Sequence, residues 1–117
     1  PEVYLPNVFA PRGKFTDNTV FRPFVGGTTI QSIDFSVFDS FNRAVYSENL
    51  TGEDIDLESI GWDGTLDSGQ DAPEGVYYYK VNIQYTASEE VSIDYFSGNG
   101  GTQVQSFSKL GSVLLVK

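Results

Sequence analysis

The sequence contains no cysteine, no histidine and no methionine. Without cysteine the chain can form no disulfide, bind no metal through thiolates and use no cysteine nucleophile. Without histidine it also lacks the commonest general base and zinc ligand. These absences exclude most familiar catalytic sites, so we expect the protein not to be an enzyme.

Basic residues are scarce: seven Lys and Arg stand against sixteen Asp and Glu, for a formal net charge of −9. Because phosphate binding needs clustered cations, nucleic acid and anionic membranes are poor partner candidates. The chain also has no apolar run of about 18 residues, so we expect no membrane insertion. It opens at Pro1 without a methionine, and we therefore expect a segment of a longer protein.

Aromatic and branched residues predominate among the apolar ones, together with twelve glycines, and this composition favours strands. In residues 76–85, tyrosines and aliphatic residues alternate with polar ones, which predicts a strand buried on one face. Residues 30–38 alternate in the same way. Asp39 and Asn42 follow, and they predict a hairpin turn with Asn42 in the left-handed conformation before a strand over 43–47.

Shorter signals complete the fold. Residues 3–5 lie between prolines and predict an edge strand, and 21–25 predict a second short strand. Residues 86–108 suggest a hairpin whose return strand is 103–108. Residues 111–117 carry apolar side chains on both faces, which predicts a terminal strand that is paired and covered. The sum is an all-β, immunoglobulin-like antiparallel β-sandwich of about seven to nine strands, forming one domain over 1–117.

Residues 48–74 hold nine acidic side chains and no basic one. Such a run is usually a solvated surface, but several carboxylates can also hold calcium. We regard Asp17, Asp63 and Asp67 as weak candidate ligands, although the spacing is not that of an EF-hand. No other cofactor is expected. Trp62 suits either a ligand-stacking platform, as in carbohydrate binders, or a core position, and a lone Trp between glycines favours the core.

Six phrases occur in an order that is more specific than any one of them: YLPNVFAP (4–11), FRPF (21–24), FSVFD (35–39), GWDGT (61–65), APEGVYYYKV (72–81) and GSVLLV (111–116). Together they resemble the gliding-motility-associated C-terminal domain, the type B sorting domain of the type IX secretion system in Bacteroidetes. The loop after the first of these phrases departs from that family's pattern. It keeps Asp17 and Asn18 but has Lys14 in place of an acid.

The resemblance implies a non-catalytic sorting signal at the C-terminus of a large exported protein. Its partners would be the outer-membrane translocon and shuttle barrel, and its location the periplasm in transit, then the cell surface or the medium. The positions that would contact them are Trp62, Asp63, Gly64, Pro73, Gly75, Val113, Leu114, Leu115, Val116 and Lys117. The alternative is an immunoglobulin-like binding module, or a calcium-stabilised spacer, of a surface protein.

Overall fold

The computed structural model describes residues 2–13, 19–52, 55–87 and 104–117. Within these ranges the chain forms seven strands and one short 3-10 helix: β1 (Glu2–Tyr4), β2 (Val8–Phe9), β3 (Phe24–Gly26), β4 (Thr28–Phe38), β5 (Ala44–Thr51), η2 (Leu57–Ser59), β6 (Gly75–Ala87) and β7 (Val104–Leu115). No helix in this part of the chain has the length and apolarity needed to cross a membrane. Trp62 and its neighbours lie between η2 and β6.

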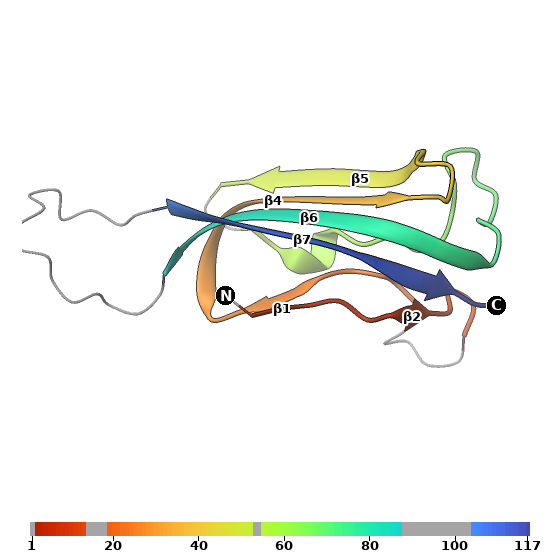
Figure 1. Cartoon of the computed structure of the whole chain (residues 1–117), viewed down its shortest axis with the longest axis horizontal. Helices are drawn as coiled ribbons and strands as arrows, with labels where there is room; N and C mark the ends of the chain where they lie inside the picture. Colours follow the sequence, from red (N-terminus) through yellow and green to blue (C-terminus); the bar gives the residue numbers. More distant parts are fainter. Residues whose placement is uncertain (1, 14–18, 53–54, 88–103) are drawn as a thin grey trace, which may run out of the picture.

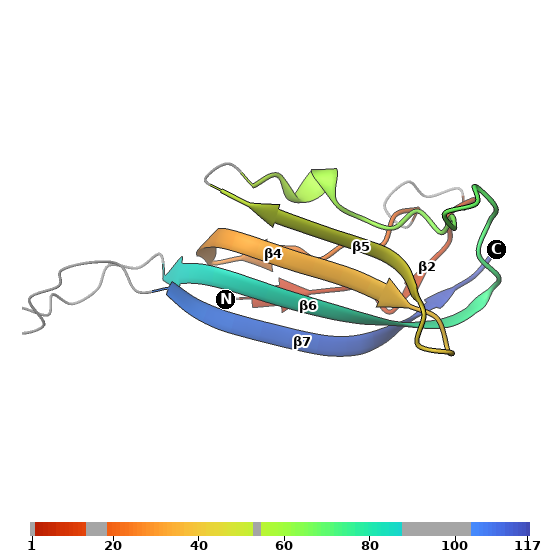
Figure 2. The same cartoon turned by 90° about the horizontal axis from the view of Figure 1, so that it is seen from above.

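The strands form two layers. The larger sheet has the order β2-β7-β6-β4-β5, and β1 pairs with β3 in a smaller sheet that lies beneath it (Figure 1). Pairing is antiparallel throughout both sheets except between β2 and β7, which run parallel. Seen from above, β5, β4, β6 and β7 lie side by side in that order (Figure 2). The predicted immunoglobulin-like sandwich is therefore confirmed.

The two strongest sequence patterns form the centre of the large sheet. Phe35 of β4 pairs with Val81 of β6, and Val37 pairs with Tyr79. All four side chains are buried, as the alternation of apolar and polar residues predicts for one face of a strand. The polar residues between them, such as Lys80, face the opposite side and are exposed.

Trp62 lies in the core and contacts residues of β2 and β6. Its backbone exchanges two hydrogen bonds with Phe21, at 2.8 and 2.9 Å, and only 1% of its surface is exposed. The indole lies 5.5 Å from the ring of Phe9 and 4.9 Å from that of Tyr77, centroid to centroid. Its Nε1–H donates to the carbonyl of Thr65 at 2.9 Å, so the buried polar atom is satisfied. The prediction that Trp62 is a core residue is confirmed.

The β4–β5 hairpin closes as the sequence indicates. The amide of Asn42 donates to the carbonyl of Asp39 at 3.0 Å, and the amide of Asp39 donates to the carbonyl of Arg43 at 2.9 Å. Asn42 has φ 65° and is the single non-glycine residue at positive φ in the described ranges. Asn tolerates this conformation better than most residues, which is why it suits the last position of the turn.

The C-terminal part differs from the prediction in two ways. The expected return strand and terminal strand are one continuous strand, β7, with Gly111 in its middle. Gly111 is no turn residue: a Cβ there would lie 2.4 Å from the hydroxyl of Tyr79, so the glycine makes room for that ring. The outer face of β7 is also not covered, because Leu110 is 72% exposed and Leu114 is 40% exposed. The tip of the predicted 86–108 hairpin lies outside the described residues.

Candidate functional site

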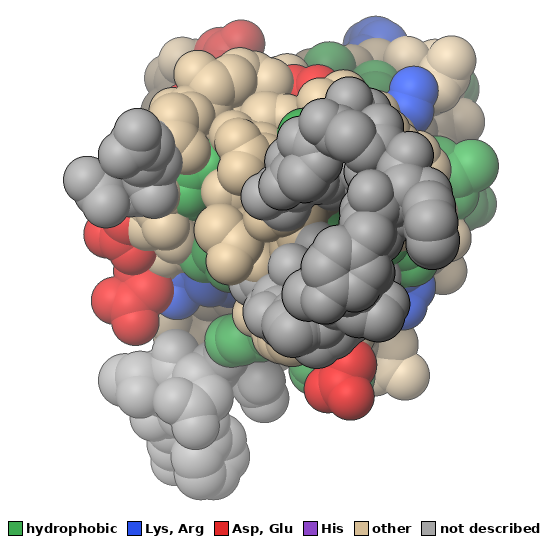
Figure 3. All heavy atoms as spheres, turned by 90° about the vertical axis from the view of Figure 1, so that its left-hand side faces the viewer, with side chains coloured by type: hydrophobic (Ala, Val, Ile, Leu, Met, Phe, Trp, Pro, Cys, Tyr) green, Lys and Arg blue, Asp and Glu red, His purple; other side chains and the backbone are tan. Residues whose placement is uncertain are grey.

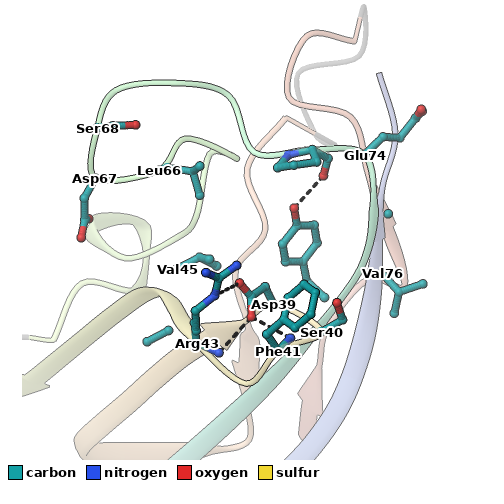
Figure 4. A pocket seen from close by; sticks show the side chains of 14 residues that line it. Asp39, Ser40, Phe41, Arg43, Val45, Leu66, Asp67, Ser68, Glu74 and Val76 are labelled. Carbon is teal, nitrogen blue, oxygen red and sulfur yellow. Dashed lines mark hydrogen bonds and ion pairs between the residues drawn. The ribbon is translucent and has the colours of Figure 1, made fainter.

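A groove of about 700 Å³ opens at the end of the sandwich where β4 turns into β5 and where the chain enters β6 (Figure 4). We call it the end groove. One wall is the β4–β5 turn, the second is the loop around Asp67, and the first residues of β6 form the third. The lining residues are Asp39, Ser40, Phe41, Arg43, Ala44, Val45, Leu66, Asp67, Ser68, Pro73, Glu74, Gly75, Val76 and Tyr77.

The turn wall is held together by Asp39. One carboxylate oxygen accepts from the amides of Phe41 and Arg43, each at 2.9 Å, and the other accepts from Nε of Arg43 at 2.8 Å. The amide of Arg43, followed by its side chain and the amide of Phe41, holds the pKa of Asp39 below its usual value, although burial acts in the opposite direction. The Arg43 guanidinium lies over the ring of Phe41, 5.2 Å from its centroid. The positive charge of this wall is thus already paired.

The loop wall presents Asp67. The amide of Gly69 donates to the carbonyl of Leu66 at 2.8 Å, and the amide of Leu66 donates to the carbonyl of Gln70, also at 2.8 Å. Gly69 has φ 89°, which this turn requires and which a side chain would disfavour. Asp67 stands at the tip of the turn, exposed, and forms no ion pair with any residue in the described ranges.

Tyr77 fixes the entry into β6. Its ring packs in the core against Trp62, and its hydroxyl donates to the carbonyl of Pro73 at 2.6 Å. Burial raises the pKa of Tyr77, and the nearby negative charge of Asp39 raises it further. A tyrosine that bonds back to the backbone just before its strand is a hallmark of immunoglobulin-like sandwiches. Its sequence signal is the four-residue spacing between Pro73 and Tyr77 at the strand start.

The outer face of the large sheet carries exposed apolar side chains next to this groove. Val8, Leu114 and Val76 are direct neighbours across β2, β7 and β6, with exposures of 38%, 40% and 47%. By alternation, Tyr78 and Leu110 lie on the same face, 48% and 72% exposed. We call these five residues the outer patch. Val76 also lines the end groove, so the two features adjoin.

The positions implied by the resemblance divide by burial. Trp62, Gly64, Val113 and Leu115 are buried, so their side chains are not available to a partner. Gly64 has φ 84° and packs against Pro11, where a Cβ would lie 2.6 Å from the proline ring.

The other predicted positions have different places. Pro73 and Gly75 line the end groove, and Leu114 belongs to the outer patch. The amide of Lys117 donates to a carboxylate oxygen of Glu74 at 3.1 Å, while Val116 is half-buried and its amide donates to the carbonyl of Phe9. Phe41, Arg43 and Leu110 were not predicted as site residues.

Of the three candidate calcium ligands, the structure describes Asp63 and Asp67, and these two have separate roles. Asp17 lies outside the described residues. Asp63 accepts from the amide of Thr65 at 3.0 Å and from its hydroxyl at 2.6 Å, so it caps a turn, whereas Asp67 stands on the groove wall. Among the described residues no group of three carboxylates could hold a metal ion. At the opposite end of the molecule, acidic side chains are scattered over the visible face (Figure 3).

Comparison with known families adds a decisive observation. The model of the FlgD Ig-like domain matches residues 25–89, more than half of the chain. The protein belongs to the FlgD Ig-like domain family. The match runs from β3 through β6 and so includes the two central strands, the hairpin and the end groove. No curated protein and no solved structure matched the chain.

Membership of this family corrects the resemblance drawn from the sequence. The six phrases pointed to the type IX sorting domain, but the family that matches is the FlgD Ig-like domain. Several of those phrases are strands and turns of a sandwich: FSVFD is the end of β4 with the first residue of the following turn, and APEGVYYYKV is the turn before β6 together with the first half of that strand. These phrases therefore indicate strands and turns of a β-sandwich and do not identify one family. The expected secretion partners and export depended on the resemblance and have no separate support.

Proposed function

We propose that this FlgD Ig-like domain is a non-catalytic module that binds a protein partner through the outer patch. The observation that carries the proposal is the row formed by Val8, Leu114 and Val76, which is in register across three strands and open to solvent. Tyr78 and Leu110 extend it along the sheet. Exposed apolar side chains that are contiguous mark interaction surfaces, whereas scattered ones carry no meaning.

The composition of the outer patch suits a protein partner. Aromatic residues are enriched and charged residues depleted at the centre of protein interfaces. Tyr78 combines a large apolar ring with a hydroxyl that has no hydrogen-bond partner among the described residues, and Ser112 lies beside it. Lys80 is the charged residue of β6 on this face, and it pairs with Leu110 across the strands.

Two other surfaces support binding less well. A carbohydrate platform at Trp62 would need an exposed indole, and this one is 1% exposed. Tyr4 and Phe24 are exposed on the small sheet, but they pair directly across β1 and β3 with ring centroids 6.1 Å apart. A cross-strand aromatic pair of this kind stabilises its own sheet.

A displayed library of random peptides tests the proposal. Peptides selected on the wild-type domain should bind a Tyr78→Ser, Leu110→Ser double variant about tenfold more weakly, measured by fluorescence anisotropy. Val104→Ser is the matched control, because Val104 lies on the same face of β7 at its far end and is 55% exposed. It should leave affinity unchanged. Selected peptides that bind the double variant as well as the wild type, or a selection that yields none, would contradict the proposal.

A further inference from the structure

We propose that the end groove binds a lysine or arginine side chain of an extended partner segment, with Asp67 as the residue that pairs with the cation. This inference rests on the proposed function, because Val76 joins the groove to the outer patch. It goes further in naming the chemistry of the ligand and the residue that recognises it.

The charge of the groove favours a cation. Three carboxylates line it (Asp39, Asp67 and Glu74) against one guanidinium, that of Arg43. Arg43 is paired with Asp39 at 2.8 Å, and Glu74 accepts a hydrogen bond from the amide of Lys117. Asp67 has neither kind of partner within the described ranges, so it is the carboxylate left to bind a ligand. The net charge of −9 also attracts basic partners over a distance.

The apolar lining favours a long aliphatic stem behind that cation. Val45, Leu66 and Pro73 line the groove together with the ring of Tyr77. Lysine and arginine bury their methylene stems along apolar surface while the charged head stays in water. A groove with apolar walls and a carboxylate at its rim matches both parts of such a side chain. A short polar or acidic side chain would match neither.

The walls are also held in shape before a ligand arrives. Figure 4 shows Asp67 and Ser68 on one side, with the Asp39–Arg43 pair and Phe41 on the other. Three hydrogen bonds to Asp39 fix the turn, and the bond from Tyr77 to Pro73 fixes the entry to β6. A pre-formed site loses less entropy on binding than one that must be ordered.

The test uses three synthetic peptides with blocked ends, glycine-serine-leucine-X-leucine-serine-glycine, in which X is lysine, norleucine or glutamate. Each is titrated to about 5 mM into the isotope-labelled domain, and backbone amide shifts are followed by NMR. The lysine peptide should shift groove amides, those of residues 39–45 and 66–77, and should bind more tightly than the norleucine peptide. The glutamate peptide should bind most weakly.

Two variants assign the effect to one carboxylate. Asp67→Asn should lower the affinity for the lysine peptide by roughly three- to fivefold, the range of an exposed ion pair. It should leave the affinity for the norleucine peptide unchanged. Glu58→Gln is the control, because it removes one negative charge from η2, outside the groove. It should change the affinity for neither peptide. Equal binding of the lysine and norleucine peptides, or shifts that leave the groove amides unchanged, would overturn the inference. So would an absence of shifts.

The failure of this inference can be told apart from failure of the proposed function. If library-selected peptides depend on Tyr78 and Leu110 but are indifferent to Asp67→Asn, the outer patch binds a partner and the groove does not recognise a cation. If the selected peptides ignore both sets of changes, the proposed function fails and the inference fails with it.

Discussion

Tyr77, Tyr78 and Tyr79 are consecutive in β6, yet they serve two different surfaces. Tyr77 and Tyr79 point into the core and are 5% and 7% exposed, while Tyr78 points outward and is 48% exposed. The pleat of the strand alone makes this division. The inner face is therefore expected to determine stability and the outer face binding, and substitutions on the two faces should separate these properties.

The largest effect is expected from truncating Trp62 on the inner side. Trp62→Ala should lower the free energy of unfolding by about 3–5 kcal/mol, because a large buried ring leaves a cavity. Leu110→Ala on the outer face, where the side chain is 72% exposed, should change it by less than about 0.5 kcal/mol. Urea unfolding followed by circular dichroism measures both. Comparable losses in the two variants would remove the distinction between the faces.

Adding one methyl group to the inner face should lower the free energy of unfolding by less than Trp62→Ala does. Gly111→Ala places a Cβ 2.4 Å from the Tyr79 hydroxyl and 2.6 Å from its ring carbon, and overpacking of this kind costs about 1–3 kcal/mol. Gly26→Ala is the control, because a Cβ there meets nothing within 4 Å. Tyr79→Val also destabilises the core, so the comparison is a double-mutant cycle: Gly111→Ala should cost less in the Tyr79→Val background than in the wild type. An equal cost in the two backgrounds would show that the two residues do not compete for space.

Removing one hydroxyl tests adjacent positions of the same strand. Tyr77→Phe deletes the bond to Pro73 and should cost about 1 kcal/mol in unfolding free energy. Tyr78→Phe removes a solvated hydroxyl from the outer face and should cost nothing measurable by the same denaturation. A larger loss of unfolding free energy for Tyr78→Phe than for Tyr77→Phe would show that the hydrogen bond from Tyr77 to Pro73 does not stabilise the domain.

The smallest effect is expected from alkaline pH. Burial raises the pKa values of Tyr77 and Tyr79 above the ordinary 10.0, so the folded state keeps these protons longer than the unfolded state. The stability that these two tyrosines contribute is fully present below pH 10 and is lost as pH rises through their raised pKa values in the folded state. Urea midpoints measured across this range should fall, and Tyr77→Phe should reduce the slope. A Tyr78→Phe variant that reduces it equally would argue against burial as the cause.

The sequence predicts the central sheet well because the alternation in β4 and β6 leaves one choice of buried face. It predicts the β4–β5 turn because Asn42 tolerates positive φ. It fails at residues 109–110, because it predicts two strands, 103–108 and 111–117, where the structure has the single strand β7, in which Gly111 makes room for the ring of Tyr79. The prediction that the terminal strand is covered also fails. Apolar residues on both faces of a strand indicate burial only if another layer packs on each face, and here the outer face has none, since Leu110 and Leu114 are exposed.

The candidate site was harder to predict than the fold. Asp67 was predicted as a weak calcium ligand and not as part of a groove. The groove exists because the loop around Asp67 and the β4–β5 turn, which are far apart in the sequence, lie at the same end of the sandwich. Asp39 was predicted as a turn residue, whereas its bond to Arg43 also neutralises the groove's one guanidinium. Such pairings depend on three-dimensional neighbours and have no local sequence signal. Tyr77 was correctly assigned to the core, but its hydroxyl bond was not foreseen.

The parallel pairing of β2 with β7 has a mechanical consequence. The amide of Leu114 bonds to the carbonyl of Asn7, and the amide of Val116 to that of Phe9, both at 3.0 Å. A force that pulls β2 and β7 in opposite directions along their length loads these bonds in shear, so they must yield together. The hydrophobic side chains of Phe9 and Leu115 behind them would have to slide out of the core in the same step. The domain is thus built to resist stretching at the place where β2 and β7 pair.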